Sequence, residues 1–120
     1  MTKKINLKNY NLYVVRLDER VLQDKKFLKK NPGYIKGKPC SYVGSTDKSI
    51  EERVSQHRSG YILNGMKWHN TYVKKYFKWI QWKQFKSINP IKNVDYLTAR
   101  SMEAKLANKL RKKGHGVWQA

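Results

Sequence analysis

The sequence is short of cysteine, of long apolar runs and of acidic residues, and the first two shortages each exclude a class of protein. Cys40 is the only cysteine among 120 residues, which excludes an internal disulfide and a cysteine-rich zinc module. We interpret it as a structural thiol in a reducing compartment. No apolar run approaches the roughly 18 residues that a membrane-spanning helix needs. The basic start MTKKINLKN has no apolar segment behind it, so we expect no secretory signal and a cytoplasmic, nucleoid-associated protein.

The shortage of acid is the strongest signal in the composition. Eight Asp and Glu residues stand against 27 Lys and Arg, which gives a formal net charge of +19. Such a charge favours a polyanionic partner, because Lys and Arg release counterions from a phosphate backbone. Nucleic acid is the expected partner and an anionic membrane surface is the competing one. Only the last predicted helix could lie on a membrane, and Glu103 interrupts its apolar stripe, so we expect no membrane partner.

Acid is absent altogether from residues 54–94, whereas residues 53–94 contain nine Lys or Arg and more than half of the aromatic residues. Cations interleaved with rings are typical of a nucleic-acid surface, where the cations hold phosphates and the rings stack on bases. The alternative is that the rings form the core while the lysines are solvated. The candidate nucleic-acid-binding residues of this stretch are Arg58, Lys67, Lys74 and Lys75.

The order of strand and helix signals predicts one α+β domain, with a small antiparallel sheet of about three strands flanked by helices. Apolar, β-branched and aromatic runs predict strands over residues 12–17, 40–44 and 78–85, the second ending at a glycine turn. Helices are predicted near residues 21–29, 50–60, 70–76 and 98–112. The expected organisation is a basic arm over residues 1–10 and a domain over 11–120, with an inserted loop at 18–39 and a turn at 89–93.

Two of these helices have clear end signals. Ser49 and Glu52 form an S-x-x-E capping box ahead of the second predicted helix. Thr98 is the expected N-cap of the last helix, and Gly114 is the residue expected to close it.

Charged residues lie on the apolar stripe of the helix that follows Ser49. At about 100° per residue, Arg53 and His57 lie within or at the edge of the stripe of Ile50 and Val54. The two are four positions apart, so their side chains are neighbours. Charged residues are rarely buried without a partner. The stripe therefore either ends at a cleft or carries a buried pair.

Glu103 repeats this pattern on the last helix, inside the stripe that contains Met102 and Leu106. It is the only acid in the last 25 residues. One interpretation is a salt bridge from Glu103 to Arg53 or to a lysine. The other is a metal site, because Mg²⁺ is often held by only one or two carboxylates and keeps several waters.

Tyr13 and Tyr42 lie in two strands that we expect to pair. Tyrosines in strands usually belong to the core, but a phenol also acts as a general base where nearby cations favour the phenolate. Cleavage of a phosphodiester needs a base, a cation that stabilises the phosphorane charge, and a metal or acid for the leaving oxygen. Tyr13, Arg53 and Glu103 supply that set.

These residues form a pattern that resembles the GIY-YIG nuclease superfamily. NLY (11–13) is similar to the first motif and YVG (42–44) to the second. YVGSTDKSIEERVSQH (42–57) resembles the stretch that leads to the family's arginine and histidine. SMEAKLANKLRKKG (101–114) resembles the late helix that carries its glutamate, and the resemblance covers residues 12–119.

The resemblance implies an endonuclease that hydrolyses DNA with one Mg²⁺ or Mn²⁺ ion, and it implies a role for each residue. Tyr13 would be the general base, and Tyr42 would line the site and orient water or phosphate. Arg53 would stabilise the scissile phosphate. His57 would contact the phosphate or assist Tyr13, and Glu103 would bind the metal ion.

The sequence departs from the family pattern in three places. Asn11 and Leu12 replace the glycine and the isoleucine of the first motif, and the 18–39 segment is longer than the usual hairpin. The asparagine that often follows the glutamate helix has no match, and Gln119 is a candidate for its place. These departures leave open the DNA specificity (branched or damaged DNA included) and whether the chain dimerises. The alternative function is a non-catalytic, basic nucleic-acid-binding module.

Overall fold

The structure is a computed structural model that describes residues 7–59, 62–63, 66–67, 71–82 and 87–119, without the side chains of residues 59, 62–63, 66–67 and 71. Its strands are β1 (Lys8–Leu17), β2 (Cys40–Thr46), β3 (Ile62–Leu63), β4 (Met66–Lys67), β5 (Phe77–Ile80), β6 (Ile91–Val94) and β7 (Gly116–Gln119). Its helices are the 3₁₀ helix η1 (Glu19–Gln23) and the α-helices α1 (Lys25–Lys30), α2 (Ile50–Ser59), α3 (Thr71–Tyr76) and α4 (Tyr96–Lys112).

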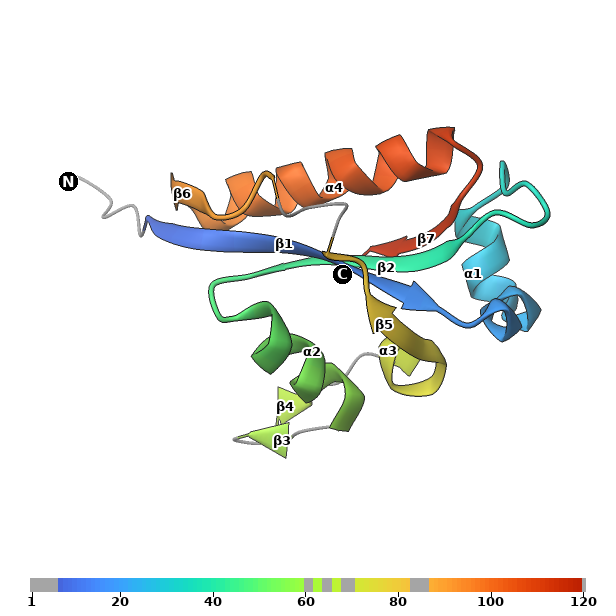
Figure 1. The fold of residues 1–120 in the computed structure, drawn as a ribbon, viewed down its shortest axis with the longest axis horizontal. Coiled ribbons are helices and arrows are strands. Elements are labelled where there is room, and N and C mark those ends of the chain that lie inside the picture. Colours follow the sequence, from blue (N-terminus) through green and yellow to red (C-terminus); the bar gives the residue numbers. More distant parts are fainter. Residues whose placement is uncertain (1–6, 60–61, 64–65, 68–70, 83–86, 120) are drawn as a thin grey trace.

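Strand β1 is the centre of a mixed five-stranded sheet (Figure 1). It pairs antiparallel with β2, β5 and β6, while β7 pairs in parallel with the outer edge of β2. Strands β3 and β4 form a separate two-stranded sheet. The α+β class is confirmed. The expectation of about three antiparallel strands was wrong in the number of strands and in the direction of one of them.

The two missed strands of the main sheet are short. β6 overlaps the predicted turn at 89–93 and β7 lies at the end of the described chain, and each has four residues. A run of four residues is too short for alternation of apolar and polar positions to be visible. Their pairing is determined by β1 and β2, which offer free edges, rather than by a local signal.

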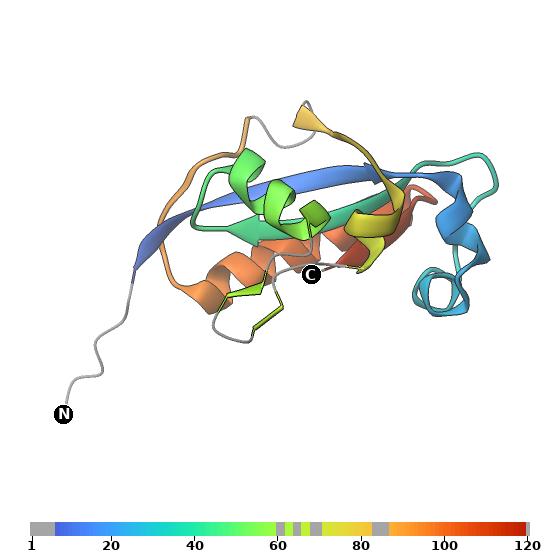
Figure 2. The ribbon, with the colours of Figure 1, turned by 90° about the horizontal axis from the view of Figure 1, so that it is seen from below.

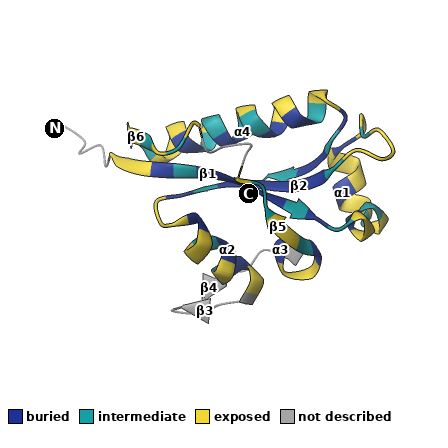
Figure 3. Ribbon diagram, in the orientation of Figure 1, coloured by how far each residue is buried: buried dark blue, intermediate teal, exposed yellow. Residues whose placement is uncertain are grey.

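Helices cover both faces of the sheet (Figures 1 and 2). α4 lies along one face, over β1, β2 and β7, and α2 and α3 lie on the other. Because side chains alternate along a strand, Tyr13 and Tyr42 face α2, and Leu12 and Val43 face α4. The middle of β1 and β2 is buried on both faces, as Figure 3 shows. Residues on either helix can therefore approach β2 from opposite sides.

Side-chain amides complete the two edges of the sheet. On β1, the backbone N–H of Leu12 donates to Oδ1 of Asn89 (2.9 Å) and its carbonyl accepts from Nδ2 of the same amide (2.7 Å), in the gap between β5 and β6. On β7, the N–H of Val117 donates to Oδ1 of Asn31 (2.7 Å) and its carbonyl accepts from Arg111 (3.0 Å). Both amides replace a strand partner, so the buried backbone groups are satisfied.

Several predicted boundaries differ from the observed ones. β1 begins at Lys8, so residues 8–10 belong to the sheet rather than to the basic arm. The 18–39 segment is more than a loop, because it contains η1 and α1, and Phe27 of α1 is fully buried. The strand predicted at 78–85 is β5, which ends at Ile80; residues 83–86 lie outside the described chain.

The predicted end of β2 and the predicted N-cap of α4 were also wrong. Gly44 does not end β2 at a turn but lies inside the strand, opposite Tyr13. The N-cap of α4 is Asp95 rather than Thr98, because the Asp95 side chain accepts from the backbone N–H of Thr98 (2.7 Å). Gly114 closes α4 as predicted, in the left-handed region at φ 86°.

Candidate active site

Tyr13 lies across β2 because Gly44 has no side chain. The two residues are partners in the β1–β2 register, and a Cβ on Gly44 would collide with the end of the Tyr13 ring. The phenol oxygen lies 2.9 Å from Nε2 of His57 on α2. The glycine of the second motif is thus needed for close approach of a ring rather than for a turn.

Helix α2 carries His57, which contacts the Tyr13 phenol, and Arg53, one turn earlier. The Ser49 hydroxyl accepts from the backbone N–H of Glu52 (3.2 Å), which is the predicted cap of the helix. His57 is 5% exposed and lies on the buried side with Val54, whereas Arg53 is half-buried and its guanidinium donates to Gln56 (3.3 Å). The stripe therefore carries a buried histidine with a phenol partner and has a guanidinium at its margin.

Three rings form the centre of the cluster. The Tyr13 and Tyr42 centroids are 6.1 Å apart, and the Tyr13 and His57 centroids are 6.2 Å apart. Tyr42 meets His57 edge-on at 5.6 Å. These are the distances of ordinary aromatic packing, so the cluster is part of the core as well as a candidate site.

Burial controls the acidity of both phenols. It raises the pKa of Tyr13 well above the ordinary value of 10.0, and the neighbouring Tyr42 raises it further while Arg53 lowers it. Burial likewise raises the pKa of Tyr42 to about 12, against the hydrogen bond from Tyr13, which lowers it. The sequence suggested that cations would favour a phenolate, but desolvation outweighs Arg53, and Tyr13 stays protonated at neutral pH.

Glu103 on α4 is 0% exposed and lies on the other face of the sheet. Its Oε2 accepts from the Ser45 hydroxyl (2.8 Å), and its Oε1 accepts from Arg100 (3.2 Å), one turn earlier on the helix. The predicted salt bridge to Arg53 or to a lysine was wrong in its partner. Arg100 takes that place because residues three apart on a helix are neighbours.

The surroundings of Glu103 only partly offset its burial. Burial raises the pKa of this carboxyl, while hydrogen bonds from Ser45, the charge of Arg100 and the side chain of Gln119 lower it. A carboxylate in this position is stabilised by any further cation that reaches it.

The donor atoms around Glu103 fit a hard divalent cation. Its carboxylate and the hydroxyl of Ser45 supply oxygen atoms, which Mg²⁺ and Mn²⁺ prefer, whereas Gln119 donates a hydrogen bond to the carboxylate. Among the described residues there is no group of three or more His, Cys, Asp or Glu side chains that could hold a metal ion. The site thus offers an ion one carboxylate, and an ion that binds there would replace the hydrogen bonds from Ser45 and Arg100 that occupy its two buried oxygens.

The two faces of the sheet meet at the outer edge of β2, near Gly44 and Ser45. The pKa of Tyr13 is affected by the charges of Arg53 and Glu103, and that of Tyr42 by Glu103, Arg53 and Arg100. The groups are thus within electrostatic reach of one another. The structure brings Tyr13, Tyr42 and His57 into contact and has Arg53 one helical turn from His57, whereas Glu103 lies with Ser45 on the opposite face of the sheet.

The nominated nucleic-acid-binding residues lie on α2 and α3. Arg58 and Lys74 are exposed and line one pocket of about 410 Å³, where the Arg58 guanidinium lies 4.0 Å from the centre of the Phe77 ring. Lys75 is exposed, with its ammonium 5.3 Å from the centre of the Tyr76 ring. Lys67 ends β4, and its side chain lies outside the described part of the chain.

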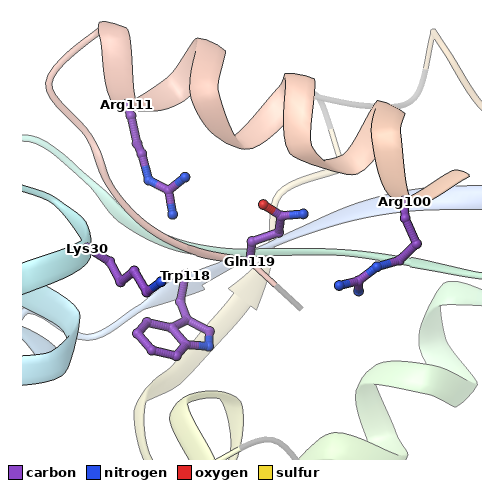
Figure 4. Close-up of a pocket in the computed structure, with 5 residues that line it drawn as sticks. All are labelled: Lys30, Arg100, Arg111, Trp118 and Gln119. Carbon is purple, nitrogen blue, oxygen red and sulfur yellow. The ribbon is translucent and has the colours of Figure 1, made fainter. Parts of the chain in front are cut away.

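A second group of residues lies beside Glu103, and the sequence nominated only one of its members, Gln119. Lys30, Arg100, Arg111, Trp118 and Gln119 line a pocket of about 330 Å³ (Figure 4). Arg100 could have been found from its position three residues before Glu103. The other members come from separate segments, and no local pattern connects them.

Comparison of the chain with known proteins gave no relative. No family model matches the chain, and neither the search of curated proteins nor that of solved structures found a match. Within the described part of the chain, no helix has both the length and the apolar character needed to cross a bilayer. The function therefore has to be argued from the site itself.

Proposed function

We propose that the chain is a divalent-metal-dependent DNA endonuclease of the GIY-YIG type. The observation that carries the proposal is the packing of Tyr13, Tyr42 and His57 on one face of the sheet, with Arg53 one turn from His57 and with the Glu103 carboxylate at Ser45 on the other face. They come from β1, β2, α2 and α4. A base, a phosphate-binding cation and a metal-binding carboxylate within reach of one another are what phosphodiester hydrolysis requires.

In this proposal, Tyr13 and His57 act together as the general base. Tyr13 takes a proton from the attacking water after its own O–H has turned from Tyr42 to Nε2 of His57, 2.9 Å away, and that proton passes to His57. The relay needs a neutral imidazole with a free lone pair on Nε2, and it does not need a free phenolate. It therefore agrees with the burial that raises the pKa of Tyr13.

Arg53 supplies the charge that the transition state needs. Its guanidinium is half-buried, and its planar fork can hold two phosphate oxygens at once. Glu103, with the hydroxyl oxygen of Ser45 beside it, would hold the Mg²⁺ or Mn²⁺ ion. When bound, the ion supplies Lewis-acid stabilisation of the leaving 3′ oxygen.

The test is nicking of supercoiled plasmid in Mg²⁺ by the wild type and by Tyr13→Phe, Arg53→Lys and Glu103→Gln. Tyr13→Phe keeps the ring and should slow cleavage by about 10²- to 10⁴-fold, the usual contribution of a general base. Arg53→Lys should fail because a lysine has no planar fork. Lys105→Ala, an exposed change on α4, is the matched control and should cleave normally. Equal nicking by all preparations would show a contaminating nuclease and overturn the proposal.

The second candidate is a non-catalytic, basic nucleic-acid-binding module. It is favoured by the ion pair of Arg100 and Glu103, which gives the carboxylate a partner without any metal. It predicts steeply salt-dependent DNA binding and no cleavage with any divalent metal. The plasmid assay, repeated with Mn²⁺ in place of Mg²⁺, separates the two candidates.

A further inference from the structure

The pocket beside Glu103 opens where α4, α1 and the free edge of β7 meet. Gln119 of β7 lies between Arg100 and Arg111, which both come from α4, and Lys30 reaches in from α1 (Figure 4). Trp118 forms the remaining wall. Three of the five lining side chains are cations and none is an acid, so the pocket is suited to an anion.

The position of Arg111 is determined by neutral groups. Its guanidinium donates to Oδ1 of Asn31 (3.2 Å), to Oδ1 of Asn108 (3.2 Å) and to the carbonyl of Val117 (3.0 Å). None of these partners carries a charge, and an arginine is effectively always protonated. The structure thus holds in place a half-buried positive charge that no carboxylate neutralises within the described residues. A group of this kind is prepared for an anionic ligand.

Lys30 adds a second uncompensated charge. It is exposed at the end of α1, and no acid of the described chain lies within ion-pair distance of it. α1 belongs to the 18–39 segment, which the resemblance to the GIY-YIG superfamily does not cover well. Lys30 is therefore a feature of this chain's own insertion.

The pocket continues from the candidate active site. Arg100 both pairs with Glu103 and lines the pocket, and Gln119 also belongs to both. Arg100 and Arg111 are 11 positions apart on α4, which corresponds to about 16 Å along the helix. A free phosphate cannot span this distance, whereas a nucleic-acid strand carries a phosphate about every 3.4 Å along the duplex axis.

We propose that this pocket is a second phosphate site, which holds a backbone phosphate of the DNA strand beside the scissile linkage. The inference rests on the proposed function for the identity of the strand. Arg111 and Lys30 bind the phosphate, and Trp118, whose ring packs 4.4 Å from that of Tyr72, forms a rigid apolar wall for the adjoining sugar or base. The 18–39 segment thereby contributes to substrate binding.

The first experiment measures binding rather than cleavage. A fluorescent duplex is titrated with wild type, Lys30→Gln and Lys29→Gln in EDTA, over a range of salt concentrations. Lys29 is the matched control, because it lies on the same helix and does not line the pocket. Lys30→Gln should reduce the slope of log affinity against log salt by about 0.9, the value for one lost phosphate contact, and Lys29→Gln should leave the slope unchanged. Equal slopes for the two variants, or no binding by the wild type, would overturn the pocket proposal.

A second experiment locates the phosphate and identifies its source. Duplexes with one uncharged methylphosphonate linkage at successive positions are compared with the unmodified duplex. The wild type should bind less tightly when the methylphosphonate stands next to the scissile linkage. Lys30→Gln should bind that duplex and the unmodified duplex equally well. If no single methylphosphonate position reduced the affinity, the strand site would be overturned. Full competition by a 5′-mononucleotide would also overturn it and would indicate a site for a free nucleotide.

The two proposals fail separately. A wild type that never cleaves but binds DNA in a manner dependent on Lys30 overturns the nuclease and keeps the phosphate site. A wild type that cleaves, with Lys30→Gln and Lys29→Gln indistinguishable in binding, keeps the nuclease and overturns the phosphate site.

Discussion

Helices α2 and α4 lie on opposite faces of the sheet, and each carries a polar side chain on its buried stripe. His57 of α2 meets the phenol of Tyr13, whereas Glu103 of α4 meets the hydroxyl of Ser45 and the charge of Arg100. We call these groups the α2 half (Tyr13, Tyr42, His57) and the α4 half (Ser45, Arg100, Glu103). The first is held by neutral hydrogen bonds and ring packing, while the second buries a carboxylate at a cost that its partners only partly offset.

Of the two halves, the α4 half is the stronger evidence for a function. A neutral pair of phenol and imidazole contributes to packing whether or not the protein is an enzyme. A buried carboxylate is unfavourable for folding. Its presence therefore points to a role other than stability. The contrast is open to test through the free energy of unfolding.

Gly44→Ala should disturb the α2 half most. The new Cβ would collide with the buried Tyr13 ring, and overpacking of this kind costs about 1–3 kcal/mol. Chemical denaturation should show the loss, and cleavage should fall because Tyr13 moves from His57. Gly33→Ala is the control, since a Cβ there meets nothing within 4 Å. If the two variants are equally stable, the ring does not need Gly44.

Ser45→Ala should weaken the α4 half next. It removes a 2.8 Å hydrogen bond to a buried carboxylate, and bonds to charged groups contribute about 1.5–3 kcal/mol. The pKa of Glu103 should also rise, because Ser45 lowers it. The measurements are urea denaturation at pH 7 and NMR titration of the carboxyl.

The control lies on the same strand and faces the same side of the sheet. Ser41 is fully buried, and its hydroxyl has no hydrogen-bond partner among the described residues. Ser41→Ala should therefore be neutral or stabilising, since it removes an unsatisfied polar group. A Ser45→Ala variant that resembles Ser41→Ala would mean that the hydroxyl does not support Glu103.

Alkaline pH should destabilise the protein through the α2 half. Burial raises the pKa of Tyr13 above 10.0 and that of Tyr42 to about 12, so both phenols stay protonated in the folded state at a pH where the unfolded chain ionises. Their contribution to the free energy of unfolding is complete below pH 10 and is lost as the pH rises above it. Each such phenol adds a slope of at most about 1.4 kcal/mol per pH unit.

Tyr13→Phe isolates one of these phenols. The variant should lose stability less steeply above pH 10 than the wild type, in denaturation curves recorded at successive pH values. Tyr96→Phe, at a position 59% exposed, should follow the wild type. Parallel curves for wild type and Tyr13→Phe would contradict the burial of the Tyr13 phenol.

The α2 half shows how far the sequence could predict the site. The helical stripe of Arg53 and His57 and the pairing of the strands of Tyr13 and Tyr42 could be predicted from sequence patterns, whereas the expectation that they form one site came from the resemblance to the GIY-YIG superfamily. The role of Gly44 was not predictable, because a glycine after a strand usually indicates a turn, and only the pairing register shows that a ring crosses it.

The α4 half was harder to predict. Glu103 stood out as an acid in a basic region, but its partners come from β2 and β7 as well as from α4. The phosphate pocket depends on a parallel strand of four residues that was not predicted and on α1, which lies within the 18–39 segment. Such assemblies are created by tertiary contacts between short segments, and local propensity carries little information about them.

Glu103→Leu should have the smallest effect on stability and thus tests the contrast most directly. Leucine replaces the carboxylate with an apolar side chain of similar size, and Arg100, which is 38% exposed, can turn into solvent. Exchanging a buried ion for apolar packing is often neutral or stabilising, so we expect a change below about 1 kcal/mol at pH 7, together with complete loss of cleavage. Because burial raises the pKa of Glu103, the wild type should gain on the variant as the pH falls and the carboxyl is protonated. A loss of about 3 kcal/mol or more at pH 7 would mean that the ion pair with Arg100 holds the fold together, and Glu103 would then need no metal to explain it.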